Sequence, residues 1–153
     1  MKFDKEIDRL LEALEFDRSR EEVREDGKTI ADMDFDVEEN QTKEEVISYF
    51  IDMDKDDPVI RYLKGLKLPK IFTYIWIQLL RIKPNQRGEG RGSEIINTLA
   101  MSHPPGSLMA LAVGEISSGK TGSSLNKVKE FYQQNGFTLV KSKDGEFYGF
   151  RVL

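Results

Sequence analysis

The sequence contains no cysteine and a single histidine, and these absences exclude several kinds of site. Without cysteine there can be no disulfide, no thiol nucleophile and no cysteine-ligated metal. The one histidine, His103, stands directly before Pro104 and Pro105, where we expect a helix to end at the surface. The sequence therefore gives no support for a catalytic site of the Ser/His/Asp type.

Long apolar runs are also missing. The apolar stretch over residues 71–80 is interrupted by Thr73 and Gln78 and is shorter than the ~20 residues needed to cross a bilayer. Residues 1–6 begin a charged helix and do not resemble a secretory signal peptide. We therefore expect a cytoplasmic protein, and its 153 residues fit one domain with a real hydrophobic core.

Charge is divided unevenly along the chain, whose formal net charge is −4. Residues 1–57 contain 21 acidic and 9 basic side chains, a net charge of −12, whereas residues 58–153 contain 6 and 14, a net charge of +8. The basic part would attract a polyanionic ligand, and the acidic part would repel nucleic acid and attract a cationic substrate. Acidic helices also keep a protein soluble without binding anything, and both explanations stay open.

A glycine-rich turn is the most informative local feature of the sequence. Between an apolar run and a helix-like pattern over residues 95–100 lie three glycines at every second position: Gly88, Gly90 and Gly92. At a helix N-terminus such a turn leaves backbone N–H groups without partners, and these amides together with the helix dipole favour phosphate oxygens. Arg87 and Arg91 add positive charge, so the turn predicts an anion-binding site.

A second block, about forty residues later, gives this turn more weight. It consists of Phe131, Tyr132, Gly136 and Phe137. Together the two blocks resemble the GNAT superfamily of acyl-CoA-dependent N-acetyltransferases, whose phosphate loop reads aliphatic-x-Pro-x-x-Arg-Gly-x-Gly-x-Gly. Its positions are filled here by Ile82, Pro84, Arg87, Gly88, Gly90 and Gly92. The family's late helix commonly ends in the pattern aromatic-Tyr-x-x-x-Gly-Phe, which the second block matches. The resemblance covers residues 70–153.

The resemblance implies a fold and separate roles for the two parts of the chain. The expected fold is α/β, with a mixed, mostly antiparallel central sheet that is split between two core strands and flanked by helices. These two strands correspond to residues 71–82 and 107–113. We expect a single domain over residues 1–153, in which the acidic residues 1–69 form the acceptor side and residues 70–153 the acetyl-CoA-binding core.

The resemblance also implies site residues. Acetyl-CoA, as co-substrate, would be bound by Leu80, Ile82, Arg87, Gly88, Gly90, Arg91, Gly92, Ser93 and Asn126. Tyr132 would protonate the departing thiolate as general acid, although it could instead serve packing alone. Ala112 stands where some relatives carry a glutamate base, so Glu115 is the nearest candidate, with water or an acidic residue of the N-terminal part as alternatives. Asn126 lies one position away from the family's asparagine.

Periodicity and end signals predict elements in the N-terminal half. An apolar stripe predicts a helix over residues 3–14, residues 17–28 are expected to form a loop, and alternation over residues 33–37 predicts a strand. A capping box starts a helix at Thr42 and Glu45, and a cap followed by proline starts another at Asp57 and Pro58, ending at Gly65. The first of these helices is expected to bury Val46, Ile47, Phe50 and Ile51.

The last part of the chain is predicted to hold one helix and one hairpin. Apolar residues at helical spacing lie between residues 125 and 132, and Gly136 marks the end of that helix. Residues 137–140 and 147–152 are expected to pair as antiparallel strands through a turn at Lys143, Asp144 and Gly145.

A competing motif occurs at residues 114–121, which satisfy the phosphate-loop pattern of nucleoside triphosphatases and include Lys120. Such a loop normally opens a large parallel sheet, yet only 32 residues follow it. No later strand ends in an aspartate placed to hold magnesium, since Asp144 falls in a turn. The context therefore favours a loop beside the acceptor pocket over a triphosphate site.

Two acidic clusters invite a calcium interpretation and do not support it. Residues 32–36 and residues 52–56 each have aspartate at every second position. Neither cluster has the glycine at position six and the glutamate at position twelve that a helix-loop-helix calcium site requires. We predict no metal site, and we expect the first cluster to be the solvent face of a strand.

The sequence thus predicts an N-acetyltransferase that moves an acetyl group from acetyl-CoA to a primary amine of a small molecule or a protein. The expected partner is a cationic amine acceptor, with no nucleic acid and no membrane, and the oligomeric state stays open. Protein lysine, protein N-terminus, polyamine and aminoglycoside are all compatible acceptors. A catalytically silent acyl-CoA-binding or protein-interaction module of the same fold is the alternative, followed by the triphosphatase.

Overall fold

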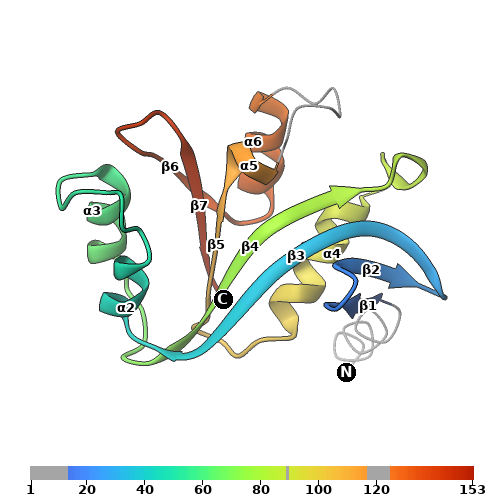
Figure 1. Cartoon of the computed structure of the whole chain (residues 1–153), viewed down its shortest axis with the longest axis horizontal. Coiled ribbons are helices and arrows are strands. Elements are labelled where there is room, and N and C mark those ends of the chain that lie inside the picture. Colours follow the sequence, from blue (N-terminus) through green and yellow to red (C-terminus); the bar gives the residue numbers. More distant parts are fainter. Residues whose placement is uncertain (1–13, 89, 117–124) are drawn as a thin grey trace.

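The computed structural model describes residues 14–88, 90–116 and 125–153. Figure 1 shows the course of the chain. The strands are β1 Leu14–Asp17, β2 Glu22–Glu25, β3 Lys28–Gln41, β4 Phe72–Ile82, β5 Leu108–Ala112, β6 Thr138–Lys141 and β7 Phe147–Val152. The helices are α2 Lys43–Ser48, α3 Pro58–Gly65, the 3₁₀ turn η1 Pro84–Gln86, α4 Arg91–Met101, α5 Val113–Ile116 and α6 Leu125–Gln134. Residues 3–13 of the helix predicted near the N-terminus lie outside the described residues.

The strands form one seven-stranded sheet in the order β1-β2-β3-β4-β5-β7-β6. All neighbouring pairs are antiparallel except β4 and β5, which run parallel in the middle of the sheet. The longest ladder joins β3 of the acidic part to β4 of the basic part, so both parts of the chain contribute to the same sheet. The expected α/β class, with a mixed and mostly antiparallel sheet flanked by helices, is confirmed.

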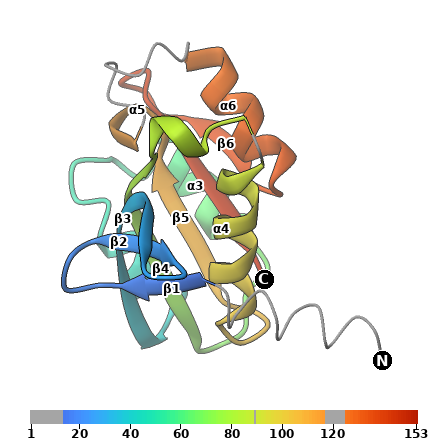
Figure 2. The same cartoon turned by 90° about the vertical axis from the view of Figure 1, so that its right-hand side faces the viewer.

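Helices cover both faces of the sheet, and this explains why β4 is apolar on both faces. Ile75 and Ile77 belong to the larger hydrophobic core, which also contains residues of α4 and α6. Tyr74 points to the opposite face, into a smaller core with residues of α2 and α3. In Figure 2, α4 and α6 lie together on the near side of the sheet, with α3 behind it.

The β1–β2 hairpin contradicts the loop expected over residues 17–28. The two strands pair antiparallel, with Leu14 opposite Glu25 and Phe16 opposite Val23. Leu14 and Val23 are buried in the larger core. Because each strand is only four residues long and its solvent face is charged, one or two apolar residues per strand were too few to show an alternating pattern.

The predicted helix caps are confirmed. Thr42 Oγ1 accepts a hydrogen bond from the Glu45 amide at 3.3 Å, which completes the capping box at the start of α2. Asp57 Oδ1 accepts one from the Val59 amide at 2.9 Å, and α3 begins at the proline that follows Asp57 and ends at Gly65.

The buried face expected for α2 is wrong at one residue. Val46 is buried, and Ile47 and Phe50 pack against the smaller core, but Ile51 is 82% exposed. The reason is the length of the helix: α2 ends at Ser48, so Ile51 is no longer carried on the helical face that the sequence period assumed.

The two central strands separate halfway along their length. β4 and β5 are paired only from Tyr74 and Leu108 to Ile77 and Leu111. Beyond Ile77, β4 continues to Ile82 paired with β3 alone, while β5 ends at Ala112 and turns into α5. The ladder with β3 shifts register at this point, leaving Gln78 as an extra residue on β4. Figure 1 shows the two strands diverging, as the expected split requires.

The triphosphatase motif finds little support in this topology. Its last residues, including Lys120, lie outside the described residues, and its first residues form the short helix α5. The strand before it belongs to a sheet with a single parallel pair, whereas such loops open large parallel sheets. Across residues 14–88, 90–116 and 125–153, no helix has the length and apolar character required to cross a membrane.

Candidate functional site

The glycine-rich turn has the backbone shape that its glycines permit. Gly88 and Gly90 have φ values of 81° and 72°, in the left-handed region that side chains with a Cβ rarely adopt. Gly90 is the N-cap of α4 and offers no side chain to cap it. The first bond of the helix runs from the Glu94 amide to the Gly90 carbonyl, so the first three amides of α4 have no acceptor within the helix.

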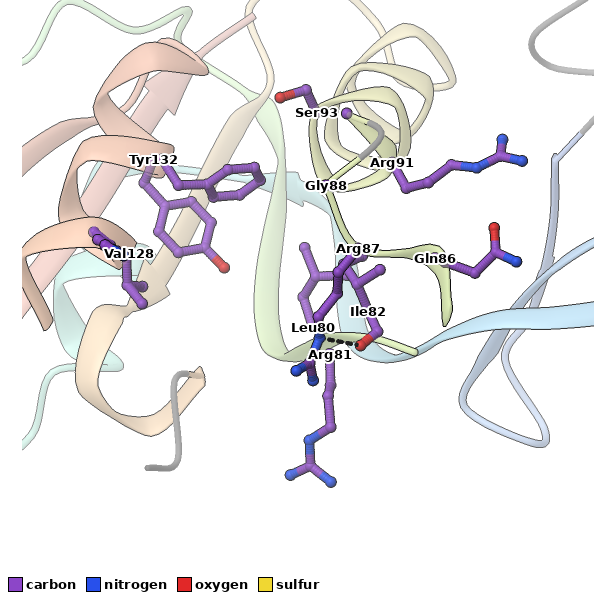
Figure 3. A pocket seen from close by; sticks show the side chains of 14 residues that line it. Leu80, Arg81, Ile82, Gln86, Arg87, Gly88, Arg91, Ser93, Val128 and Tyr132 are labelled. Atoms are coloured by element: carbon purple, nitrogen blue, oxygen red, sulfur yellow. Dashed lines mark hydrogen bonds between the residues drawn. The ribbon is translucent and has the colours of Figure 1, made fainter. Parts of the chain in front are cut away.

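A cavity of about 400 Å³ opens beside this helix N-terminus. It is bounded by the end of β4, the glycine-rich turn, the first turn of α4 and one face of α6. Figure 3 shows Tyr132 and Val128 on one side of it and Leu80 and Ile82 on the other. The cavity brings together most of the residues predicted for the site: Leu80, Ile82, Arg87, Gly88, Gly90, Arg91, Gly92, Ser93 and Tyr132.

The two arginines of the turn have different surroundings. The Arg91 guanidinium forms a two-pronged ion pair with Glu25 of β2, both contacts at 2.8 Å, and a third contact with Glu94 at 3.2 Å. These carboxylates raise the pKa of Arg91. Its positive charge is thus balanced within the protein, and it ties the start of α4 to the N-terminal hairpin. Arg87 is exposed and donates from Nε to the Ile82 carbonyl at 3.1 Å.

Helices α4 and α6 are fastened together at the cavity. Asn135 Nδ2 donates to Ser93 Oγ at 3.1 Å and to the Phe131 carbonyl at 2.8 Å. Gly92 packs against the Phe131 ring so closely that a Cβ added to it would lie 2.8 Å from a ring carbon. Gly92 is therefore required for close helix packing, a role distinct from the left-handed backbone of Gly88 and Gly90.

Tyr132 is placed at the inner end of the cavity. Its side chain is 2% exposed and packs edge-to-face against Phe131 and Phe137, with ring centres 5.0 and 5.6 Å away. In Figure 3 its phenol oxygen points from α6 toward the end of β4. Burial raises the pKa of the Tyr132 phenol, so the group stays protonated at neutral pH.

The two remaining predicted residues are Asn126 and Glu115. Asn126 is exposed on α6 and does not line it. Glu115 falls in α5, and its side chain lies outside what the structure describes. The cavity is also lined by residues that were not among those predicted for the site: Arg81, Gln86, Lys127, Val128 and Phe131. Val128 and Phe131 share the α6 stripe with Tyr132, so helical period was the signal that could have identified them.

We expect the protein to lose stability above about pH 10, where a tyrosine exposed by unfolding begins to ionise. Burial raises the pKa of both Tyr74 and Tyr132, so these phenols keep their protons in the folded state. Below about pH 10 both states are protonated and the contribution is constant. Above about pH 10, each phenol lowers the free energy of unfolding by up to about 1.4 kcal/mol per pH unit, until the pH reaches the pKa of the folded state.

Urea denaturation at about pH 8 and about pH 11 measures this effect. The variant Tyr74→Phe removes one of the two phenols while keeping its ring. Its free energy of unfolding should therefore fall less steeply over this range than that of the wild type, and the comparison cancels the titration of lysines. Parallel curves for the two proteins would contradict the expectation.

No protein-family model and no curated protein matches this sequence. Among solved structures, the fold is similar to that of a GNAT-family acetyltransferase from Listeria monocytogenes 4b F2365. The TM-score is 0.46 and the identity 12%, over 86% of this chain and 63% of that one. It is also similar to a mutant agmatine N-acetyltransferase in its apo form, with a TM-score of 0.45 and 14% identity, over 86% of this chain and 72% of that one. This chain thus spans less than two thirds of the Listeria protein, and at these identities the similarity concerns the fold alone.

Proposed function

We propose that this protein is an N-acetyltransferase that uses acetyl-CoA to acylate a primary amine. The observation that carries the proposal is the cavity where three features meet: the uncapped amides of α4, the end of β4 beyond its separation from β5, and the buried phenol of Tyr132. Phosphate binding, thioester binding and proton donation each need one of these features. All three features line or border the same cavity.

The residues present fit a phosphorylated thioester. At the outer end, the amides of Arg91, Gly92 and Ser93 suit phosphate oxygens, and a Cβ built on Gly88 or Gly90 meets nothing within 4 Å, so the turn is open to a ligand. Because Arg91 is neutralised by glutamates, backbone amides would supply most of the attraction, with Arg87 at the rim. Four other lining residues are apolar, as contact with a pantetheine chain requires: Leu80, Ile82, Val128 and Phe131.

The chain's own groups would handle the protons. An amine with a pKa near ~10.4 is protonated at neutral pH and must lose a proton before its nitrogen attacks the thioester carbonyl. As the new C–N bond forms and the C–S bond breaks, the sulfur leaves as a thiolate and takes a proton from the Tyr132 phenol, which solvent then restores. Backbone amides at the separated strands would stabilise the negative charge on the carbonyl oxygen.

The proton acceptor would come from outside the two central strands, because neither β4 nor β5 contains Asp or Glu. On the other face of the sheet, a second cavity is lined by Asp36, Glu38 and Asp52, all from the acidic part of the chain. Water ordered by these carboxylates would carry the proton away. The same lack of a strand carboxylate is the observation that favours the alternative, a silent acyl-CoA-binding module of this fold.

Isothermal titration with acetyl-CoA and, separately, with ATP and magnesium tests the proposal. We expect acetyl-CoA to bind with about one molecule per chain, and CoA release to follow when an amine is added. We expect no ATP hydrolysis, and Lys120→Ala should leave acetyl-CoA binding unchanged. Acetyl-CoA binding without turnover on any amine would favour the silent module, and magnesium-dependent ATP hydrolysis lost in Lys120→Ala would establish the triphosphatase.

A further inference from the structure

A second cavity of about 430 Å³ lies on the opposite face of the sheet from the first. Its floor is formed by side chains of β3, β4, β5 and β7, and the segment following α2 closes one side. Trp76 and Ala112 place it next to the point where β4 and β5 separate, since the last paired residues of these strands are Ile77 and Leu111. The cavity has the volume of a small-molecule site.

Aromatic rings make up much of the wall. They are Tyr49, Phe50, Tyr74, Trp76 and Tyr148. Tyr49 and Tyr74 stack at 5.7 Å between ring centres, and Phe50 packs edge-to-face against Trp76 and Tyr148 at 6.1 and 5.7 Å. The Tyr49 hydroxyl donates to the Gln41 side chain, which holds this ring at the end of β3. Aromatic faces attract cations, and most strongly when water is partly excluded.

The charge in this cavity is of one sign. Asp36, Glu38 and Asp52 line it, and none of the described residues lining it is a lysine or arginine. Register places Asp36 opposite Trp76 and Glu38 opposite Tyr74, so each carboxylate stands beside a ring on the same face of the sheet. Burial, followed by the charge of Glu38, raises the pKa of Tyr49, so this phenol adds no charge at neutral pH.

We propose that this cavity selects a small acceptor with two amino groups, a linear diamine, by binding the ammonium that does not react. The inference rests on the proposed acetyl transfer and names its substrate class. One amine would reach the thioester through the separation of β4 and β5, beside Trp76 and Ala112. The other would stay charged between the aromatic rings and the carboxylates of β3.

The spacing of the strands suits such a molecule. Strands β3, β4 and β5 are consecutive in the sheet, and neighbouring strands lie about 4.8 Å apart. The point midway between β4 and β5, where the two strands part, thus lies about one and a half strand spacings, or about 7 Å, from Asp36 on β3. A diamine with a short alkyl chain spans this distance, and its methylene groups would cover the rings. A neutral or acidic end group would leave three carboxylates without a counter-charge.

Three acceptors of equal chain length test the preference: diaminobutane, butylamine and aminobutanoate. We expect kcat/KM for diaminobutane to exceed that for butylamine by about 10- to 100-fold, the range of one cation–π contact combined with one ion pair. Aminobutanoate should be the poorest of the three. Equal values for diaminobutane and butylamine, or a higher value for a lysine-containing peptide, would overturn the proposal.

Charge variants on a single strand locate the effect. The double variant Asp36→Asn/Glu38→Gln should reduce the ratio of kcat/KM for diaminobutane over butylamine toward one. The control is Glu39→Gln, which removes one negative charge, against two in the double variant, from the same strand but in a different cavity, with Phe35 and Val37. It should keep the wild-type ratio. A ratio that falls equally in both proteins would show a general effect of charge and overturn the site.

Binding can be followed without turnover because Trp76 is the single tryptophan of the chain. Diaminobutane should change Trp76 fluorescence in the wild type and in Glu39→Gln, and much less in Asp36→Asn/Glu38→Gln. If acetyl-CoA fails to bind while the fluorescence responds as expected, the proposed function is wrong and the cation site stands. If acetyl-CoA binds and no diamine is preferred or detected, the cation site alone is wrong.

Discussion

Replacing Tyr132 by phenylalanine should lower turnover on a competent amine by about 10²- to 10⁴-fold, the usual effect of removing a positioned general acid. The ring should stay in place, because its contacts with Phe131 and Phe137 are made by ring atoms and not by the hydroxyl. What disappears is the phenolic proton, which the departing thiolate of the proposed reaction would take.

Steady-state kinetics, acetyl-CoA titration and urea denaturation of Tyr132→Phe separate the possible roles. We expect kcat to fall while acetyl-CoA affinity and the free energy of unfolding at neutral pH remain close to wild type. Wild-type turnover would show that Tyr132 serves packing only and that water or another group protonates the sulfur. A parallel loss of affinity would instead place the hydroxyl in ground-state binding.

Valine at position 90 should weaken acetyl-CoA binding at least about 100-fold, the loss of one to two hydrogen bonds to a charged phosphate. Gly90 lines the cavity as the N-cap of α4, and a Cβ built there points into open space. The larger valine side chain would occupy the space where phosphate approaches the amides of the first turn. Its positive φ also adds strain of about 1–2 kcal/mol.

Gly145→Val is the matched control for this strain. Gly145 has a φ of 89° and equally open surroundings, but it lies in the β6–β7 turn and does not line the cavity. Both variants should lose similar stability in urea denaturation, and only Gly90→Val should lose acetyl-CoA affinity in calorimetry. Equal affinities in the two folded variants would remove the phosphate site from the glycine-rich turn.

Short-range features of the fold followed from the sequence because their causes are local. The caps at Thr42 and Asp57 depend on a side-chain oxygen meeting an amide two or three residues ahead, and both formed. The positive φ of Gly88 and Gly90 and the uncapped start of α4 are also set within a few residues. For the same reason the backbone shape of the glycine-rich turn, on which the predicted anion site depends, could be expected before its surroundings were known.

Contacts between distant residues were decided by the tertiary structure. The charge pattern suggested that Arg91 serves the phosphate site, yet the fold brings Glu25 to it from 66 residues away and neutralises it. The β1–β2 hairpin exists because pairing with β3 supplies the partner that two four-residue strands cannot supply for themselves. Neither effect leaves a periodic signal in the sequence.

In the acidic N-terminal part, the sequence determines the sign of the charge and the tertiary structure determines where that charge is located. Its net charge of −12 gave the sign of a possible substrate, but not whether the charge is collected at one place. Pairing of β3 with β4 puts Asp36 beside Trp76 and Glu38 beside Tyr74, and the segment following α2 adds Asp52. Composition fixed the sign of the charge, because it needs no geometry. Only the register of the sheet, a long-range property, turned that charge into a pocket next to the separated strands.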